Sequence, residues 1–377
     1  MTSLRTDKRL LIVLSSLCAE GTPVLTLELG RRWQAMGISP VVVSLGAGPH
    51  DLAGEFRAAQ IPVETLILPA RTAPRFAALT LGIGRLCRRL RPAAVLSMPL
   101  GWHAFSFLGA RAAGVRATAA HVGNYPPVGL PETLRKFRLL VQAGRPLTDK
   151  LICCSSYIEQ GVWDHFGIPR HKTEVIYNGI DVQDVARRAD AARSSAPPAR
   201  PFVVGMVARL EVHKDQPTLI RAAAALRAAG RQMKVWLVGE GSRRGEYERL
   251  VRELGLTDTV ELLGMRRDVP ELLGAMDAFV FSAKPDEGLG VALIEALAAR
   301  LPIIATNVGA CREVLLDGAL GKLVPEGDAT AMAAAIAAIM DDPASARAAA
   351  ERGLDRAREA FSIDQMAARY AACLRLK

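Results

Sequence analysis

Short apolar runs alternate with amphipathic stretches along almost the whole chain. In the amphipathic stretches apolar residues recur every three or four positions, which is typical of helices with one buried face. Uninterrupted apolar runs between turn signals are typical of strands that are buried on both faces. The runs are LLIVLSS, PVVVSL, VETLIL, AAVLSM and KLICCS, followed by FVVGMVA, KVWLVGE, TVELLG, AFVFSA and PIIATNV. This alternation predicts an α/β protein with parallel sheets covered by helices on both faces.

The alternation is interrupted once, by a stretch that is rich in Ala, Arg, Ser and Pro. This stretch, ARRADAARSSAPPARP, has the composition of a linker. We therefore predict an N-terminal domain over residues 1–183, a linker over 184–200 and a C-terminal domain from 201, each doubly wound. Because ligands of such sheets bind beyond the carboxyl ends of the strands, we expect the site in the cleft between the two domains.

The N-terminus has two interpretations. Arg5, Lys8 and Arg9 followed by LLIVLSSLCA resemble a short signal peptide. The same residues are typical of a first buried strand and a loop, which we favour because similar runs recur along the chain. No apolar stretch approaches the roughly 20 residues that a transmembrane helix needs.

Composition narrows the classes of partner. The 377 residues are 50% hydrophobic, which argues against disorder, and carry a net charge of +10, which favours anionic partners such as nucleotides or acidic lipids. Aromatic residues make up only 5%, so few stacking platforms exist for single-stranded nucleic acid, and we predict no nucleic-acid partner. The six cysteines are scattered without a CxxC pair, which is typical of a reduced cytoplasmic protein without a zinc site.

Charged residues follow one predicted strand of the second domain. Arg209 and Lys214 come directly after FVVGMVA, at the end of the strand where a ligand is expected. An arginine fork and a lysine ammonium can together hold a diphosphate and stabilise the charge that develops when it leaves. The alternative interpretation is a pair of solvated surface cations.

Two carboxylates flank a glycine-rich turn further along the same domain. Glu287 precedes Gly288 and Gly290, and Glu295 lies within the helix predicted over residues 291–297. A helix that begins at glycines exposes free N–H groups and a positive dipole end, which suits a phosphate. The alternative is a solvated Glu287 and a surface Glu295.

A glycine cluster and two histidines also come under consideration. Gly239, Gly241 and Gly245 nearly match the dinucleotide-binding fingerprint, but the third glycine is one residue late, so we favour a tight turn. His121 ends an apolar run, where it could donate a hydrogen bond or shuttle a proton, although a lone histidine is more often structural. His103 is the competing candidate. No DxD or HExxH motif occurs, so no metal site is predicted.

In combination, these motifs resemble the retaining GT-B glycosyltransferases of family 4, also called glycosyl transferases group 1. The resemblance covers nearly all of the second domain, and Glu287-x7-Glu295 is its most specific part. It rests on Arg209-x4-Lys214, VGEG, RRDVPELLGAMDAFVFSA, EGLGVALIEALAARLPIIATNVGACREVLLDG and GKLVP. The first domain matches more loosely, through an early glycine loop, the His121 strand end, CCSSYIEQG and VIYNGID.

The resemblance implies a GT-B architecture of two Rossmann-like, doubly wound domains that face each other across a cleft. The domain over residues 201–362 would bind the nucleotide-sugar, and a C-terminal helix over about 363–377 would cross back onto the first domain. The implied roles are catalytic for His121, Arg209, Lys214 and Glu287, and donor-binding for Gly21, Met265, Arg267, Gly288, Leu289, Gly290, Val291 and Glu295. Among these, Arg209 and Lys214 would bind the diphosphate, Glu287 the donor sugar, and Glu295 the ribose hydroxyls.

The implied function is a metal-independent retaining hexosyltransferase without a cofactor. Its donor would be a UDP- or GDP-linked sugar, and its acceptor a glycan or a lipid-linked glycan in cell-envelope or exopolysaccharide synthesis. Two departures weaken the match at the diphosphate, because CAEGTPV offers Gly21 alone and HKDQ lacks the glycine that commonly follows the lysine. The alternatives are a nucleotide-sugar-binding protein that has lost catalysis and a Rossmann-type oxidoreductase.

Basic and apolar residues mix in residues 75–92 and 134–150 of the first domain. Such a mixture is typical of a helix lying on an anionic membrane, but also of an ordinary helix packed on a sheet. In the second stretch the cations are Arg135, Lys136, Arg138 and Arg145. We therefore expect a cytoplasmic enzyme, with attachment to the inner face of the cell membrane as the accompanying hypothesis.

Overall fold

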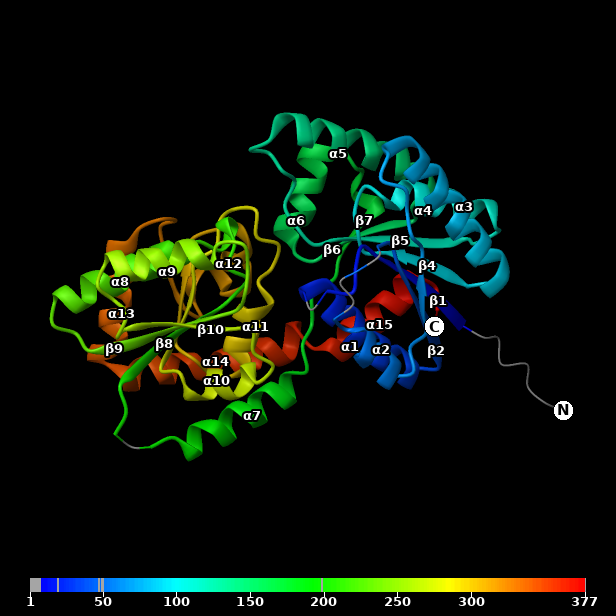
Figure 1. The fold of residues 1–377 in the computed structure, drawn as a ribbon. Helices are drawn as coiled ribbons and strands as arrows, with labels where there is room; N and C mark the ends of the chain where they lie inside the picture. The colour runs from blue at the N-terminus through cyan, green and yellow to red at the C-terminus, as the bar shows by residue number, and fades with distance from the viewer. Residues whose placement is uncertain (1–7, 19, 47, 49–50, 198, 377) are drawn as a thin grey trace. The chain divides into compact units, whose positions relative to one another are not determined.

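The computed structural model describes residues 8–18, 20–46, 48, 51–197 and 199–376. The chain divides into two compact units, Met1–Gly179 together with Ile363–Lys377, and Ile180–Ser362. Each unit has one parallel sheet with helices on both of its faces (Figure 1). Because both faces are covered, strands such as LLIVL are buried over their whole length, and this explains their continuous apolar runs.

The N-terminal unit contains a seven-stranded sheet in the order β3-β2-β1-β4-β5-β6-β7. Its strands are β1 (Lys8–Leu14), β2 (Ile38–Ser44), β3 (Val63–Thr65), β4 (Ala94–Ser97), β5 (Ala117–Val122), β6 (Lys150–Cys153) and β7 (Thr173–Val175). Its helices are α1 (Gly21–Ala35), α2 (Ala53–Ala58), α3 (Thr72–Leu90), α4 (His103–Ala112), α5 (Pro131–Gly144), α6 (Ser156–Gly161) and α15 (Ile363–Cys373). The run LLIVLSSLCA thus contributes most of β1, as expected for a first strand.

The C-terminal helix α15 completes the core of this N-terminal unit. It lies against α1, where the Trp33 indole N–H donates a 3.0 Å hydrogen bond to the carbonyl of Ala367 (Figure 1). The Trp33 and Tyr370 rings pack at a centroid distance of 6.2 Å, and both side chains are fully buried. The last residues of the chain are therefore part of the first half of the fold.

The C-terminal unit contains a six-stranded sheet in the order β10-β9-β8-β11-β12-β13. Its strands are β8 (Phe202–Val207), β9 (Met233–Val238), β10 (Val260–Gly264), β11 (Ala278–Phe281), β12 (Ile303–Thr306) and β13 (Lys322–Val324). Its helices are α7 (Val182–Ser195), α8 (Gln216–Ala228), α9 (Arg244–Glu253), α10 (Val269–Ala275), α11 (Val291–Ala298), α12 (Gly309–Val314), α13 (Ala329–Asp341) and α14 (Pro343–Ala360).

The structure differs from the expected linker at residues 184–200. Most of this stretch is helix α7, which belongs to the C-terminal unit. Its buried face is formed by Val182, Val185, Ala186 and Ala189, which follow a helical spacing. Arg188 on the same helix donates two hydrogen bonds, of 2.7 and 2.6 Å, to the Glu271 carboxylate of α10. The Ala- and Arg-rich composition concealed an amphipathic helix because alanine forms much of its narrow buried face.

The strand order of each sheet reverses at one place. The reversal lies between β1 and β4 in the N-terminal unit and between β8 and β11 in the C-terminal unit. At such a switch point the loops that leave the two neighbouring strands diverge, and a crevice opens beyond their carboxyl ends. In the C-terminal unit, these are the loops that carry the predicted diphosphate and sugar residues.

Candidate functional site

The loops after β8 and β11 are fixed to each other at the switch point of the C-terminal unit. The buried Ser282 hydroxyl, directly after β11, donates a 2.9 Å hydrogen bond to the carbonyl of Asp215. The backbone N–H of Lys284 donates a 3.0 Å hydrogen bond to the carbonyl of His213. These bonds hold the two loops in one arrangement, so the charged side chains that they carry are positioned by the backbone.

Lys214 and Glu287 form an ion pair between these two loops. Their side chains are only 16% and 10% exposed, and the Glu287 carboxylate also accepts a 3.2 Å hydrogen bond from the N–H of Gly288. The Lys214 ammonium lies 5.3 Å from the centre of the Phe281 ring, within the range of a cation–π contact. A pair this poorly solvated depends on such additional contacts, because removing charges from water is costly.

The glycine turn between the two carboxylates has a conformation that glycine favours. Gly290 has a φ of 78°, and a Cβ atom there would lie 2.9 Å from the Phe281 ring. Helix α11 starts at the next residue, Val291, so its first N–H groups lack partners within the helix. Gly288 and Leu289 are buried in the same turn. The turn thus brings a helix start close to the Lys214–Glu287 pair.

Glu295 lies on α11, slightly more than one turn from the helix start. It is half-buried, and no hydrogen bond or ion pair to its carboxylate is found within the described part of the chain. Burial raises the pKa of Glu295 to about 7. A half-buried acid without a hydrogen-bond partner among the described residues is costly to keep charged, and hydroxyl donors from a ligand would supply hydrogen bonds.

Arg209 belongs to the same loop as Lys214 but points to different neighbours. Its half-exposed guanidinium lies 3.3 Å from the carboxylate of Glu211. Glu211 accepts hydrogen bonds from the N–H and the hydroxyl of Ser242, at 3.1 and 2.8 Å, and these bonds lower its pKa. Glu211 therefore ties the loop after β8 to the loop after β9.

The glycines of the VGEG stretch allow two backbones to approach each other. A Cβ atom on Gly239, whose φ is 140°, would lie 2.1 Å from the carbonyl oxygen of Ala208. A Cβ atom on Gly241 would lie 2.4 Å from the carbonyl oxygen of Leu210. The two glycines are thus used for close packing between the loop after β9 and the loop after β8. This arrangement fits the predicted tight turn rather than an oxidoreductase motif.

Met265 and Arg267, which were predicted to lie near the base, follow β10. Both side chains are exposed. The end of β10 is linked to the end of β9 by a bridge between Gly239 and Gly264, whose N–H to carbonyl hydrogen bond is 2.8 Å long. β9 separates β10 from β8, so these two residues lie two strands away from the Lys214–Glu287 pair.

The predicted residues of the N-terminal unit have different surroundings. His121 lies in β5 and is buried, and its Nδ1 shares a 2.9 Å hydrogen bond with the hydroxyl of Tyr370 on α15. Burial lowers the pKa of His121 to about 4, so the ring is neutral near pH 7 and is poorly suited to shuttle a proton. Gly21 begins α1 and is exposed.

His103, the competing histidine, begins α4 and is fully buried. Its Nδ1 accepts a 3.0 Å hydrogen bond from the N–H of Gly101, and burial lowers its pKa to about 4. Its Nε2 has no hydrogen-bond partner among the residues that the structure describes. Both histidines therefore have the burial of core residues.

Most of the predicted residues of the C-terminal unit lie on the loops after β8 and β11 or on α11: Lys214, Glu287, Gly288, Leu289, Gly290, Val291 and Glu295. Arg209 lies at the edge of this group. Met265 and Arg267 lie further along the sheet edge, after β10. Sequence reasoning missed Glu211, Phe281 and Ser282, which hold the site in place. The partner of Ser282, Asp215, is 67 positions away in the sequence, so no local pattern pointed to this bond. For Glu211 and Phe281 the partners are distant in sequence, and no local pattern pointed to them.

No group of three or more His, Cys, Asp or Glu side chains in the part of the chain that the structure describes could hold a metal ion. Likewise, none of its helices combines the length and apolar character needed to cross a bilayer.

Models of two protein families match the chain. The model described as Glycosyl transferases group 1 matches residues 188–356, and the model described as Glycosyltransferase Family 4 matches residues 19–184. The first match contains the Lys214–Glu287 pair and Glu295, and the second contains Gly21 and His121.

Relatives and solved structures show the same likeness. The lipopolysaccharide core biosynthesis glycosyltransferase LpsE of Rhizobium meliloti is 31% identical over 230 residues, which are 61% of this chain and 65% of LpsE. An N-acetylgalactosaminyltransferase of Campylobacter jejuni, whose name gives a diphospho-undecaprenol-linked acceptor, is 27% identical over 224 residues, 59% of each chain. The match spans about half of the length of other curated relatives, such as EpsD of Bacillus subtilis and an α-D-kanosaminyltransferase of Streptomyces kanamyceticus.

The structure of HepE from Anabaena, in complex with UDP and glucose, superposes with a TM-score of 0.84 at 21% identity and covers 98% of this chain and all of HepE. The structure of the lipopolysaccharide glycosyltransferase WaaG gives 0.73 at 16% identity, covering 97% of this chain and 99% of WaaG. At this level of identity the likeness shows the fold, and the predicted GT-B architecture is confirmed.

Proposed function

Because the chain belongs to the group 1 glycosyltransferases of family 4, we propose that it transfers a hexose from a nucleotide-diphosphate sugar, with retention of configuration, to a glycan or lipid-linked acceptor in cell-envelope or polysaccharide synthesis. The observation that carries the proposal is the Lys214–Glu287 ion pair beside the Gly288–Gly290 turn, at the switch point of the C-terminal sheet. The Lys214 ammonium suits the diphosphate of such a donor, and the Glu287 carboxylate suits the hydroxyl groups of its sugar.

Lys214 and Arg209 would stabilise the departing diphosphate. Bond breaking between the sugar and the diphosphate moves negative charge onto the phosphate oxygens, and fixed cations lower the energy of that state. In the free protein Lys214 is paired with Glu287. When the donor binds, its phosphate takes over Lys214, and its sugar hydroxyls donate to the Glu287 carboxylate, so neither charge is left unpaired.

The remaining donor contacts follow along α11 and the sheet edge. The first N–H groups of α11, at Gly290 and Val291, would bind phosphate oxygens, because a helix start attracts anions. Glu295 would accept hydrogen bonds from both ribose hydroxyls. Met265 and Arg267 would flank the base, which is uracil or guanine.

Two residues of the N-terminal unit belong to the proposal through the family resemblance. Gly21 begins α1, after the loop that follows β1, where its small size would allow a donor phosphate to approach the backbone. His121 would donate a hydrogen bond to the donor sugar as a neutral ring, consistent with its lowered pKa. Its bond to Tyr370 would fix the orientation of the ring.

Helix α5 of the N-terminal unit supports an acceptor at a membrane surface. The helix exposes Arg135, Lys136 and Arg138 together with Leu139, whose residue surface is 64% exposed. The preceding segment adds Leu130, which is 61% exposed. Exposed leucines among cations are unusual for a helix packed on a sheet and are typical of a helix that lies on anionic lipid. We therefore propose peripheral attachment to the inner face of the cell membrane.

The test is a panel of UDP- and GDP-linked sugars assayed by thermal shift and then for transfer to polyprenyl-diphosphate glycans in anionic liposomes. We expect one nucleotide to stabilise the protein and its sugar to be transferred with the anomeric configuration retained, also in EDTA. Donor binding without transfer or hydrolysis would identify a protein that has lost catalysis. Loss of transfer in EDTA, with recovery in magnesium, would contradict the metal-independent mechanism.

A further inference from the structure

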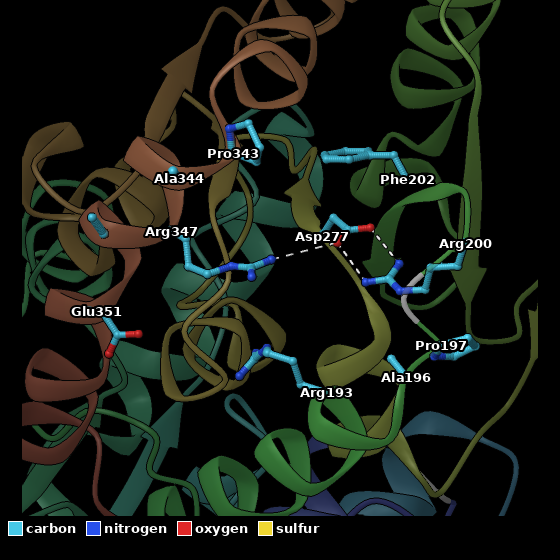
Figure 2. Close-up of a pocket in the computed structure, with 11 residues that line it drawn as sticks. Arg193, Ala196, Pro197, Arg200, Phe202, Asp277, Pro343, Ala344, Arg347 and Glu351 are labelled. Atoms are coloured by element: carbon cyan, nitrogen blue, oxygen red, sulfur yellow. Dashed lines mark hydrogen bonds and ion pairs between the residues drawn. The ribbon is translucent and has the colours of Figure 1, made fainter.

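A large cavity lies at the opposite end of the C-terminal sheet from the Lys214–Glu287 pair. Its volume is about 800 Å³, and it adjoins Phe202 at the start of β8 and Asp277 directly before β11 (Figure 2). The six residues of β8 span about 20 Å, so the cavity and the donor residues beyond the other end of that strand are separate sites. Other walls come from the end of α7 and the start of α14.

Arginines outnumber the carboxylates around this cavity. Arg193, Arg200 and Arg347 line it, together with Asp277 and Glu351 as the acidic residues. Arg200 donates hydrogen bonds of 2.7 and 2.8 Å to Asp277, which uses the charge of that carboxylate. The lining therefore has one positive charge in excess.

The residues directly behind the lining do not remove this excess. Arg193 pairs at 2.8 Å with Asp190, which also forms an ion pair with Arg300. Arg300 in turn lies 3.8 Å from Glu351. Asp190 and Arg300 add one negative and one positive charge to the lining residues, so the excess of one arginine is unchanged.

Arg347 is the arginine with free donors. It lies on α14, and its closest approach to a carboxylate is 4.0 Å, to Asp277, which is longer than a hydrogen bond. No hydrogen bond of Arg347 is found within the described residues, and Figure 2 shows its guanidinium extended into the cavity toward Asp277. A guanidinium carries five N–H donors in a planar fork that matches a phosphate group.

The cavity also has an apolar wall and more room than an inorganic anion fills. The Phe202 ring and Pro343 lie on the same side of the cavity, with Ala344 near Pro343, whereas Ala196 lies beside Pro197 near Arg193 (Figure 2). Cavities of several hundred cubic ångströms hold small organic molecules. We propose that the C-terminal unit has a second ligand site that binds an organic phosphate monoester, with the phosphate on Arg347 and the organic part against Phe202 and Pro343.

The chain passes between the two units twice, after Gly179 and after Ser362. We call these two places the crossings, and the two helices that line the cavity lead to them. Helix α7 begins shortly after the first crossing, and α14 ends shortly before the second. The N–H of Ile180 donates a 2.9 Å hydrogen bond to the carbonyl of Phe361, so the two crossings are tied together. A ligand held between the far ends of α7 and α14 would couple both helices, which is the arrangement of a regulatory site.

Hydrogen exchange and calorimetry test the proposal on the full chain. Adenosine monophosphate and glucose 6-phosphate represent the nucleotide and sugar-phosphate sources, and adenosine and glucose are the controls that lack phosphate. Saturating UDP or GDP, whichever stabilises the protein in the donor panel, is added to occupy the donor site. We expect at least one of the two phosphates to bind and to protect residues 193–202 and 343–351, and neither control to do so.

The variant Arg347→Ala should weaken this binding at least tenfold. The matched control is Arg358→Ala, which removes an exposed arginine from the other end of the same helix, where it pairs with Asp355. The proposal is wrong if neither phosphate binds at millimolar concentration, or if Arg347→Ala binds as tightly as the wild type. Protection confined to residues 284–295 would also overturn it, because the phosphate would then occupy the donor site.

Discussion

The two sheets share one architecture, but their switch points differ in chemistry. In the C-terminal unit the loops beyond β8 and β11 carry Lys214 and Glu287 as a poorly solvated ion pair, and the half-buried acid Glu295 follows on α11. In the N-terminal unit, the histidine predicted to act, His121, is buried, neutral and bonded to Tyr370.

The charge of the N-terminal unit lies elsewhere, on exposed surfaces such as that of α5. This contrast teaches that a doubly wound sheet provides the place for a ligand, while the loops decide its chemistry. The C-terminal unit has the features of a site for a charged donor. For the N-terminal unit, the exposed cations and leucines of α5 support our proposal of a surface for an amphiphilic acceptor.

The largest effect should come from Lys214→Ala, which tests whether the chemistry depends on the C-terminal unit. Removing a cation that stabilises the leaving group should lower kcat by about 10²- to 10³-fold. The donor KM should change less, because the interaction is strongest in the transition state. Steady-state kinetics measure both constants. The control is Lys234→Ala, a half-exposed lysine on β9 that pairs with Glu261; a drop in kcat of similar size there would point to a non-specific effect.

Charge reversal on α5 tests the other half of the comparison. Replacing Arg135, Lys136 and Arg138 by Glu should reduce binding to anionic liposomes by more than about 100-fold, at about 1 kcal/mol for each cation. Sedimentation measures the binding, which should also weaken with salt because exposed charges are screened.

The matched control for α5 reverses three exposed cations of the C-terminal unit, Arg221, Arg249 and Arg252. If this control lost liposome binding equally, net charge rather than α5 would explain attachment. If the wild type ignored anionic liposomes at low salt, a soluble glycan would become the favoured acceptor.

Glu295→Ala should weaken donor binding at least tenfold, because it removes hydrogen bonds to the ribose worth about 1.5–3 kcal/mol each. The wild-type affinity should also fall as the pH drops below about 7, where Glu295 becomes protonated and loses an acceptor. Calorimetry at several pH values measures both effects. Glu253→Ala, an exposed position at the end of α9, should change neither; an unchanged donor Kd in Glu295→Ala would remove Glu295 from the donor site.

The same acid should affect stability with the opposite sign. Its folded pKa lies above that of the unfolded chain, so its contribution is fully present below about pH 4.5 and is lost as the pH rises through about 7. Glu295→Gln should therefore raise the thermal unfolding temperature at pH 8 more than at pH 6. Equal shifts at the two pH values would mean that the raised pKa has no role in stability.

The smallest effect should come from Tyr370→Phe, which removes the hydrogen bond to His121 but keeps the ring. We expect a loss of about 1 kcal/mol in the stability of the N-terminal unit, measured by urea unfolding. If His121 contacts the donor sugar, kcat should also fall severalfold, because the ring loses the bond that fixes its orientation. An unchanged kcat would indicate that His121 only supports the core.

Much of the fold could be predicted because continuous apolar runs and helical spacing are local properties of the chain. The expected linker shows where this fails. Val182, Val185, Ala186 and Ala189 form a helix face that is recognisable once its partner α10 is known. The Arg188–Glu271 contact joins residues that are 83 positions apart, and no local pattern predicts such a distance.

The site divides in the same way. Glu287, the glycine turn and Glu295 form one continuous motif, so they could be recognised together. The pairing of Lys214 with Glu287 depends on strand order, because β8 and β11 become neighbours only in the assembled sheet. The cavity around Arg347 combines three separate segments, and its charge excess could not be anticipated from any one of them.

The position of helix α15 in the sequence affects how the protein folds during its synthesis. The N-terminal unit uses residues from two distant parts of the chain, and Trp33 and His121 receive their partners Ala367 and Tyr370 from α15, which is made after the C-terminal unit. During synthesis the core of the N-terminal unit therefore lacks α15 until the whole C-terminal unit has been translated. A premature stop codon that removes α15 would therefore destabilise the N-terminal unit, although most of that unit is made first.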